Sequence, residues 1–234
     1  MTDFFRFPHT PHLAWLGEGV PRDDKVLSSG EADSLLAGDV TVEEKLDGAN
    51  LGFSLGPDVQ LRMQNRGQYL AEPHAGQFAR LPSWLAGHAD ALLDVLTPEL
   101  ILFGEWCTAR HSLDYSALPD WFLLFDVYDR AAGRFWSTTR RNALAQATGL
   151  VTVPQVLKGR TTLADLERLV TNMPSHYRRT GQPLEGVVVR RESAEWCEAR
   201  AKLVRSDFAQ AIDIHWRKRA IEWNRVNYAP VARA

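Results

Sequence analysis

The chain has 234 residues, of which 45% are hydrophobic and 24% are charged, as in ordinary soluble globular proteins. Its net charge of −2, from 27 basic and 29 acidic residues, does not by itself indicate a nucleic-acid-binding protein. No stretch approaches the roughly 18 apolar residues of a membrane span, and the N-terminus lacks the apolar core of a signal peptide. We therefore expect a cytoplasmic protein outside the membrane, with Cys107 and Cys197 as free thiols.

In chain order, short runs rich in Val, Leu and aromatic residues are interspersed with stretches of helical periodicity. The short runs predict strands over residues 42–45, 51–55, 59–64, 100–106, 121–128, 186–190 and 199–204. The periodic stretches predict helices over residues 83–96, 139–148, 163–173 and 208–223. Because the strands are grouped and do not alternate regularly with helices, this order predicts an α+β fold with largely antiparallel sheets.

The first predicted strand ends in a lysine that precedes a turn. Lys45 is followed by Leu46 and then by Asp47-Gly48, a strong turn signal, so its side chain can project into a cleft. A lysine attacks phosphorus only when its pKa falls below the usual value of about 10.4, through burial or a neighbouring cation such as a metal ion. The pattern Lys-x-Asp-Gly arises by chance in about one chain in twenty of this length, so it needs support from other segments.

Later strands carry ionisable side chains near their ends. Glu105 lies at the end of an apolar strand, Glu185 precedes a β-branched strand, and Phe125 alternates with Leu and Val next to acids. Arg200 and Lys202 are two residues apart in the last strand and share one face. Each residue alone has a structural explanation: solvated acids at strand ends, core packing for the phenylalanine, and protection of an edge strand by the two cations.

Together, and in this order, these segments resemble the motifs of the covalent nucleotidyltransferases, the superfamily of ATP-dependent ligases and capping enzymes. Asn50, Arg66 and the N-terminal run Phe-Pro-His-Thr-Pro-His-Leu at residues 7–13 are similar to RNA ligases of the group that includes the second RNA ligase of phage T4. The resemblance extends from Lys45 to Lys202. It implies a nucleotidyltransferase (ATP-grasp-like) domain of two largely antiparallel sheets flanked by helices, with a nucleotide cleft between them.

The resemblance implies a role for each matching residue. Lys45 would take AMP from ATP through a phosphoramide bond. The expected metal ligands, for Mg²⁺ or Mn²⁺ held largely through water, are Asp47, Glu105 and Glu185. With Lys45 and Lys202, these carboxylates form the expected catalytic set. The other nucleotide contacts would be Glu44 against the adenine, Phe125 stacked on it, Glu105 at the ribose, Arg200 and Lys202 at the phosphate, and Asn50 and Arg66 around the nucleotide and the 5′-phosphate end.

The C-terminal part departs from the family pattern. The last motif usually reads Lys-x-Lys, whereas here it is Arg200-Ala201-Lys202 or, in the other register, a motif starting at Lys202 that lacks its second lysine. From residue 200 to the end, eight basic residues oppose three acidic ones, which marks either a phosphate-facing end or a solvated helix face. We expect one adenylyltransferase domain over residues 1–234, with a basic helical tail over 207–234 whose tryptophans pack, and no OB or other C-terminal domain.

These observations predict an ATP-dependent RNA ligase that self-adenylylates on Lys45, transfers AMP to the 5′-phosphate of an RNA end and seals that end to a 3′-hydroxyl. We expect a monomer that acts in RNA repair, with an end-healing kinase or phosphatase as partner. The alternatives are an ATP-dependent DNA ligase, a capping guanylyltransferase, an enzyme that adenylylates another acceptor, and a nucleic-acid-binding module without ligation activity. Formation of a covalent adduct with ATP would exclude the last of these.

Overall fold

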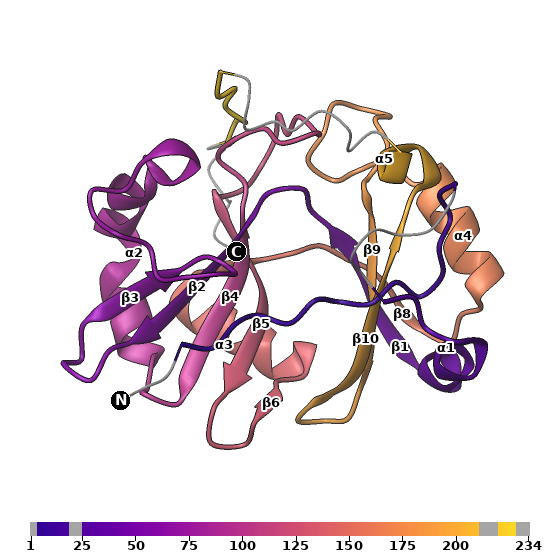
Figure 1. Ribbon diagram of the computed structural model, residues 1–234, viewed down its shortest axis with the longest axis horizontal. Helices are drawn as coiled ribbons and strands as arrows, with labels where there is room; N and C mark the ends of the chain where they lie inside the picture. Colours follow the sequence, from indigo (N-terminus) through magenta and orange to yellow (C-terminus); the bar gives the residue numbers. More distant parts are fainter. Residues whose placement is uncertain (1–3, 19–24, 211–219, 228–234) are drawn as a thin grey trace.

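The structure, a computed structural model, describes residues 4–18, 25–210 and 220–227. Its strands form two sheets that lie side by side (Figure 1). The first sheet contains, in spatial order, β3 (Leu61–Gln64), β2 (Ala49–Leu55), β4 (Leu100–Trp106), β5 (Phe122–Asp129) and β6 (Arg134–Phe135), with β7 (Val151–Thr152) parallel to β5. The second sheet contains β10 (Cys197–Val204), β9 (Gly186–Glu192), β1 (Val40–Lys45) and β8 (Gln155–Gly159). All other neighbouring strands pair antiparallel, which confirms the predicted fold class.

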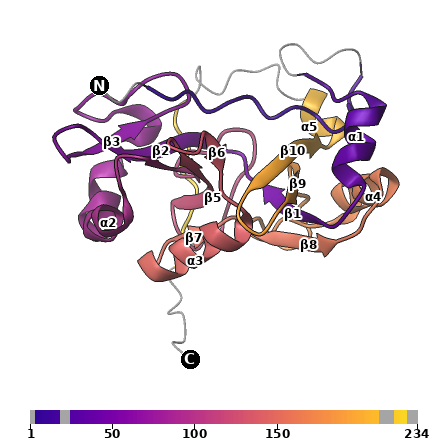
Figure 2. The same ribbon diagram turned by 90° about the horizontal axis from the view of Figure 1, so that it is seen from below.

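Each sheet buries one face against its own helices (Figure 2). The helices α2 (Leu81–Val95) and α3 (Thr138–Thr148) pack on the first sheet. The helices α1 (Ser29–Leu36) and α4 (Leu163–Asn172) pack on the second. Among the described residues, no helix is both long enough and apolar enough to cross a membrane. Both cysteines are free, as predicted.

The predicted strands are all present, and their ends differ from the expected ones for local reasons. The third strand begins at Leu61 because Val59 takes a left-handed conformation, with φ of 61°, in the preceding turn. Helix α1, the strands β6, β7 and β8, and the short 3-10 helix η1 (Gly76–Phe78) were not predicted. Helix α1 begins with a capping box in which Ser28 and Glu31 bond each other's backbone, a signal present in the sequence.

The predicted helix over residues 208–223 is wrong at its C-terminal end. A short helix, α5 (Ser206–Gln210), follows β10, and residues 211–219 lie outside the described part of the chain. Residues 220–227 are extended, with bridges from Trp223 to Ala109 and from Val226 to Leu118. Hydrogen bonds to the segment after β4 replace helical hydrogen bonds in this part of the chain. The expected helical tail is therefore corrected over residues 220–227 to an extended segment, which we call the strap.

An N-terminal segment, residues 4–16, crosses from the first sheet to the second (Figure 1). Gln64 Nε2 donates to the carbonyl of Phe5 at 2.8 Å, which fixes its start on β3. At the other end, the Lys202 N–H donates to the Pro11 carbonyl at 2.8 Å, and the Leu13 N–H donates to the Lys202 carbonyl at 2.7 Å. This segment therefore fixes the backbone of Lys202 on β10.

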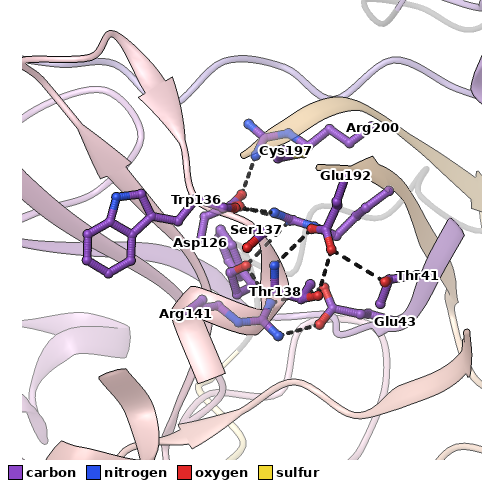
Figure 3. A network of polar contacts seen from close by, with 12 residues as sticks. Thr41, Glu43, Asp126, Trp136, Ser137, Thr138, Arg141, Glu192, Cys197 and Arg200 are labelled. Carbon is purple, nitrogen blue, oxygen red and sulfur yellow. Dashed lines mark hydrogen bonds and ion pairs between the residues drawn. The ribbon is translucent and has the colours of Figure 1, made fainter. Parts of the chain in front are cut away.

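A buried network of charges also joins the two sheets (Figure 3). Arg141 on α3 binds both carboxylate oxygens of Glu43 on β1, at 2.5 and 3.1 Å. Asp126 on β5 binds Arg190 on β9, at 2.8 Å, and Arg200 on β10. Because these ion pairs connect one sheet to the other, they fix the spacing between the two sheets and hence the width of any ligand site between them.

Candidate active site

A cavity of about 600 Å³ lies between the two sheets and collects most of the predicted site residues. Such a volume is within the usual range for small-molecule sites. The predicted residues that line it are Glu44, Lys45, Asn50, Arg66, Glu105, Phe125, Arg200 and Lys202. The other two, Asp47 and Glu185, lie just behind this wall, in contact with Lys45 or its turn.

Lys45 is the last residue of β1, where it pairs with Gly186 of β9. Its Nζ atom lies 2.7 Å from Glu185 Oε1. Burial alone would lower the pKa of Lys45, but the facing carboxylates of Glu185, Glu105 and Asp47 outweigh it and hold that pKa above its ordinary value. The expectation that burial and neighbouring cations lower this pKa is thus not met by the protein alone. A cation that takes up the carboxylate charge would be needed to release the amine.

Two buried carboxylates lie next to Lys45. Burial raises the pKa of Glu105 to about 7, against the opposing effects of Lys45 and of the Gly48 N–H, which donates to Glu105 Oε1 at 2.9 Å. Burial likewise raises the pKa of Glu185 to about 8. The close approach requires glycine at position 48, because a Cβ there would lie 2.7 Å from the Trp106 carbonyl oxygen.

These two carboxylates fit a divalent cation. Glu185 Oε2 is buried and has no hydrogen-bond partner in the described part of the chain, although Oε1 pairs with Lys45. A buried acceptor without a donor is costly, and a cation would satisfy it. Glu105 and Glu185 are thus the residues that would hold hydrated Mg²⁺ or Mn²⁺.

Asp47 does not share this arrangement. Its Oδ2 atom accepts the N–H groups of Ser112 and Leu113, at 2.7 and 2.8 Å, and its own N–H donates to the Tyr115 hydroxyl at 2.8 Å. In the described part of the chain, no group of three or more His, Cys, Asp or Glu side chains is placed to hold a metal ion. Asp47 thus anchors the turn after Lys45 to the segment that follows β4, and its expected part in holding a hydrated metal ion stays a prediction.

Glu44, on the wall of the cavity, carries an acceptor that no described protein group uses. Glu44 Oε2 accepts the N–H of His176 at 3.0 Å and lies 2.7 Å from His176 Nδ1. Glu44 Oε1 is buried and has no hydrogen-bond partner among the described residues. No sequence motif pointed to His176, which is 132 residues from Glu44 and lies outside any helix or strand. Phe125 lines the same cavity and supplies an aromatic face.

Positively charged side chains that could bind phosphate groups also line the cavity. The guanidinium groups of Arg66 and Arg200 lie 6.0 and 4.7 Å from the centroid of the Phe7 ring. Arg66 Nε and Asn50 Oδ1 are buried without a hydrogen-bond partner. Arg200 and Lys202 both line the cavity from one face of β10, which favours the register that reads Arg200-Ala201-Lys202. Sequence reasoning missed Arg190, which lines the cavity, and Arg141, because no local motif marks either arginine.

The family to which these motifs belong follows from sequence comparison. The sequence model of the RNA ligase family matches residues 38–204, well over half of the chain. The chain belongs to the RNA ligase family. The matched region contains all ten predicted site residues. A comparison with curated proteins finds no match.

Solved RNA ligases share this fold at low sequence identity. A lysine-to-alanine variant of the Naegleria gruberi RNA ligase with ATP and manganese has a TM-score of 0.63 and 16% identity, over 87% of this chain and 57% of that one. An archaeal ATP-dependent RNA ligase has a TM-score of 0.62 and 20% identity, over 89% of this chain and 50% of that one. The Naegleria gruberi RNA ligase with pyrophosphate has a TM-score of 0.59 and 19% identity, over 76% and 52%. The chain thus spans about half the length of the solved structures that it matches.

Proposed function

We propose that this member of the RNA ligase family is an ATP-dependent RNA ligase domain that becomes adenylylated on Lys45. The observation that carries the proposal is the position of Lys45: it opens into a nucleotide-sized cavity, and its Nζ atom is held 2.7 Å from a buried carboxylate. Family membership supports the reaction class, and the geometry supports Lys45 as the nucleophile. The substrates would be ATP and RNA ends with a 5′-phosphate and a 3′-hydroxyl, prepared by an end-healing kinase or phosphatase.

In the first step, the lone pair of Lys45 Nζ attacks the α-phosphorus of ATP. A phosphorus–nitrogen bond forms, the bond to the bridging oxygen breaks, and pyrophosphate leaves. Glu185 Oε1 is placed to receive the proton that Nζ loses. A divalent cation held by Glu105 and Glu185 would neutralise phosphate oxygens and lower the pKa of Lys45 when bound. Phosphoryl transfer needs little else from the protein beyond alignment and charge.

In the second step, an oxygen of the RNA 5′-phosphate attacks the phosphorus of the lysine adduct, and Nζ leaves. In the third, the 3′-hydroxyl attacks the 5′-phosphate, a phosphodiester bond forms, and AMP leaves. Both steps build negative charge on oxygens near Arg66, Arg200 and Lys202, which line the cavity. These cations support catalysis by stabilising charge that grows in the transition state.

The choice of ATP over GTP follows from Glu44. Its unpartnered Oε1 atom can accept a hydrogen bond from the exocyclic amine of adenine. Guanine carries a carbonyl oxygen at that position, which would face the carboxylate without a proton between them. A site that leaves a buried polar group unpaired rejects the wrong ligand strongly.

The test is transfer of label from ATP that is radioactive at the α-phosphate. Wild-type protein should form a covalent adduct that releases AMP when 5′-phosphorylated RNA is added, and Lys45→Ala should form none. Lys158→Ala is the matched control, because Lys158 is an exposed lysine on β8 of the same sheet. An adduct on Lys45→Ala would refute the assignment of the nucleophile. A chase that succeeds with 5′-phosphorylated DNA but not with RNA would refute the assignment of the acceptor.

A further inference from the structure

A second cavity, of about 400 Å³, lies beside the start of α2. Its wall includes Arg80, Trp121 and Val226, which come from three separate parts of the chain. Arg80 is only two residues after Phe78, which lines the active-site cavity, so their Cα atoms are at most about 7 Å apart. A bound RNA strand that leaves the active site along η1 would therefore meet this cavity next.

Arg80, on the wall of this second cavity, brings its guanidinium group close to two indole rings. Arg80 Cζ lies 5.3 Å from the centroid of the Trp121 ring and 4.3 Å from that of Trp223. Trp223 is 38% exposed, and Trp121 is half-buried. Two aromatic faces and one cation, all reachable from solvent, are the groups that bind single-stranded nucleic acid through base stacking and phosphate contact. We call these three residues the Arg80 platform.

The exposed indole is held in place and is not at a loose end. Asn224, the next residue, is buried and makes three hydrogen bonds of 2.9 Å to the segment after β4: it accepts the Tyr115 N–H and donates to the carbonyls of Thr108 and Cys107. Trp223 itself bridges to Ala109. A rigid aromatic surface loses little conformational entropy when a ligand binds, which favours a binding role over simple exposure.

The charge around the platform suits a polyanion. The acid in this cavity, Asp120, is already paired: it accepts Trp84 Nε1–H at 2.6 Å and lies 3.3 Å from His88 Nε2. The exposed Glu222 pairs with Arg110 at 2.6 Å. In the part of the chain that the structure describes, neither carboxylate pairs with Arg80, so its charge is available for a phosphate.

We propose that the Arg80 platform binds the single-stranded RNA next to the end being joined, with a base stacked on Trp121 or Trp223 and its phosphate on Arg80. The inference rests on the proposed function, which supplies RNA as the substrate. It replaces the expectation that the C-terminal tryptophans only pack. It also provides RNA contact within this chain, which spans about half of its solved relatives.

Binding is tested on the full chain with a short, fluorescent, 5′-phosphorylated single-stranded RNA, by anisotropy and without ATP. Trp223→Ala should weaken binding about tenfold, whereas Trp223→Phe, which keeps an aromatic face, should bind nearly as the wild type does. Arg80→Gln should also weaken binding and reduce the salt dependence by about one phosphate contact. Ile221→Ala is the matched control, because Ile221 is an exposed apolar residue of the same strap and does not belong to the Arg80 platform.

Wild-type affinity in both Trp223→Ala and Arg80→Gln would overturn the platform, as would an equal loss in Ile221→Ala. If Trp223→Ala fails to fold, as judged by thermal melting, Arg80→Gln alone decides. Labelling of Lys45 by ATP is measured in parallel and needs no RNA. If labelling fails but RNA binding depends on Trp223, the ligase proposal falls and the platform stands; if labelling succeeds and RNA binding ignores Trp223 and Arg80, the platform falls alone.

Discussion

Replacing Arg141 by methionine tests whether the buried network holds the two sheets together. Arg141 and Glu43 are 1% and 2% exposed, and the guanidinium binds both carboxylate oxygens and the Phe125 carbonyl, the last at 2.7 Å. Arg141→Met would leave the Glu43 carboxylate buried without its cation. Removing one partner of such a pair costs about 3–5 kcal/mol, a large part of the 5–15 kcal/mol that stabilises a typical domain.

The assay is urea unfolding followed by circular dichroism. For a loss of about 4 kcal/mol and a urea dependence of about 2.5 kcal/mol per molar, the midpoint should fall by about 1.6 M. The matched control is Arg160→Met, because Arg160 is an exposed arginine 3.9 Å from the exposed Asp39, and this change should cost less than about 1 kcal/mol. The double variant Glu43→Leu with Arg141→Met replaces the pair by apolar side chains and should be more stable than Arg141→Met alone, with a coupling energy of about 3 kcal/mol.

Two results would refute this reasoning. One is a loss below about 1 kcal/mol in Arg141→Met, which would mean that water or another donor compensates Glu43. The other is simple additivity of the two substitutions in the double variant, which would mean that the guanidinium and the carboxylate are not energetically coupled.

Three further predictions concern the site and its surroundings. His176→Phe removes the ring donor that fixes Glu44, so the KM for ATP in adduct formation should rise about tenfold and the preference for ATP over GTP should fall. His176→Asn should keep more of the ATP affinity and of this preference. Unchanged kinetics in the phenylalanine variant would contradict this role. Chelation of divalent cations should slow labelling of Lys45 by about 100-fold or more at neutral pH. The residual rate should increase with pH, because the carboxylates hold the pKa of Lys45 above its ordinary value. A residual rate that does not depend on pH would contradict this explanation. The hydrogen bond to Asp120 raises the pKa of His88 above 6.5. The protonated histidine therefore stabilises the fold fully below pH 6.5, and this effect is lost as the pH rises through the folded-state pKa. The free energy of unfolding of the wild type should exceed that of His88→Asn by a few tenths of a kcal/mol at low pH and converge with it at high pH.

Local sequence determined most of the elements and the place of Lys45 at a strand end. Runs rich in Val, Leu and aromatic residues predicted seven of the strands, and the Asp-Gly turn placed Lys45 at the end of the first, where the structure has it. The same patterns predicted Glu105 and Lys202 on strands that line the cavity. Elements depend on a few neighbouring residues, so residue composition, periodicity and turn chemistry are enough to find them, whereas the expected roles of these residues came from the resemblance of the ordered motifs to a family.

Tertiary structure alone decided what those residues touch. Asp47 Oδ2 accepts backbone N–H groups some 65 residues away, a contact that its motif does not reveal. The helical periodicity before Trp223 gives way to an extended strap, because hydrogen bonds from Asn224 to the segment after β4 replace helical ones. The pKa of Lys45 also depends on three carboxylates that folding brings around a buried amine. Burial and long-range pairing are properties of the packed chain, so no window of sequence contains them.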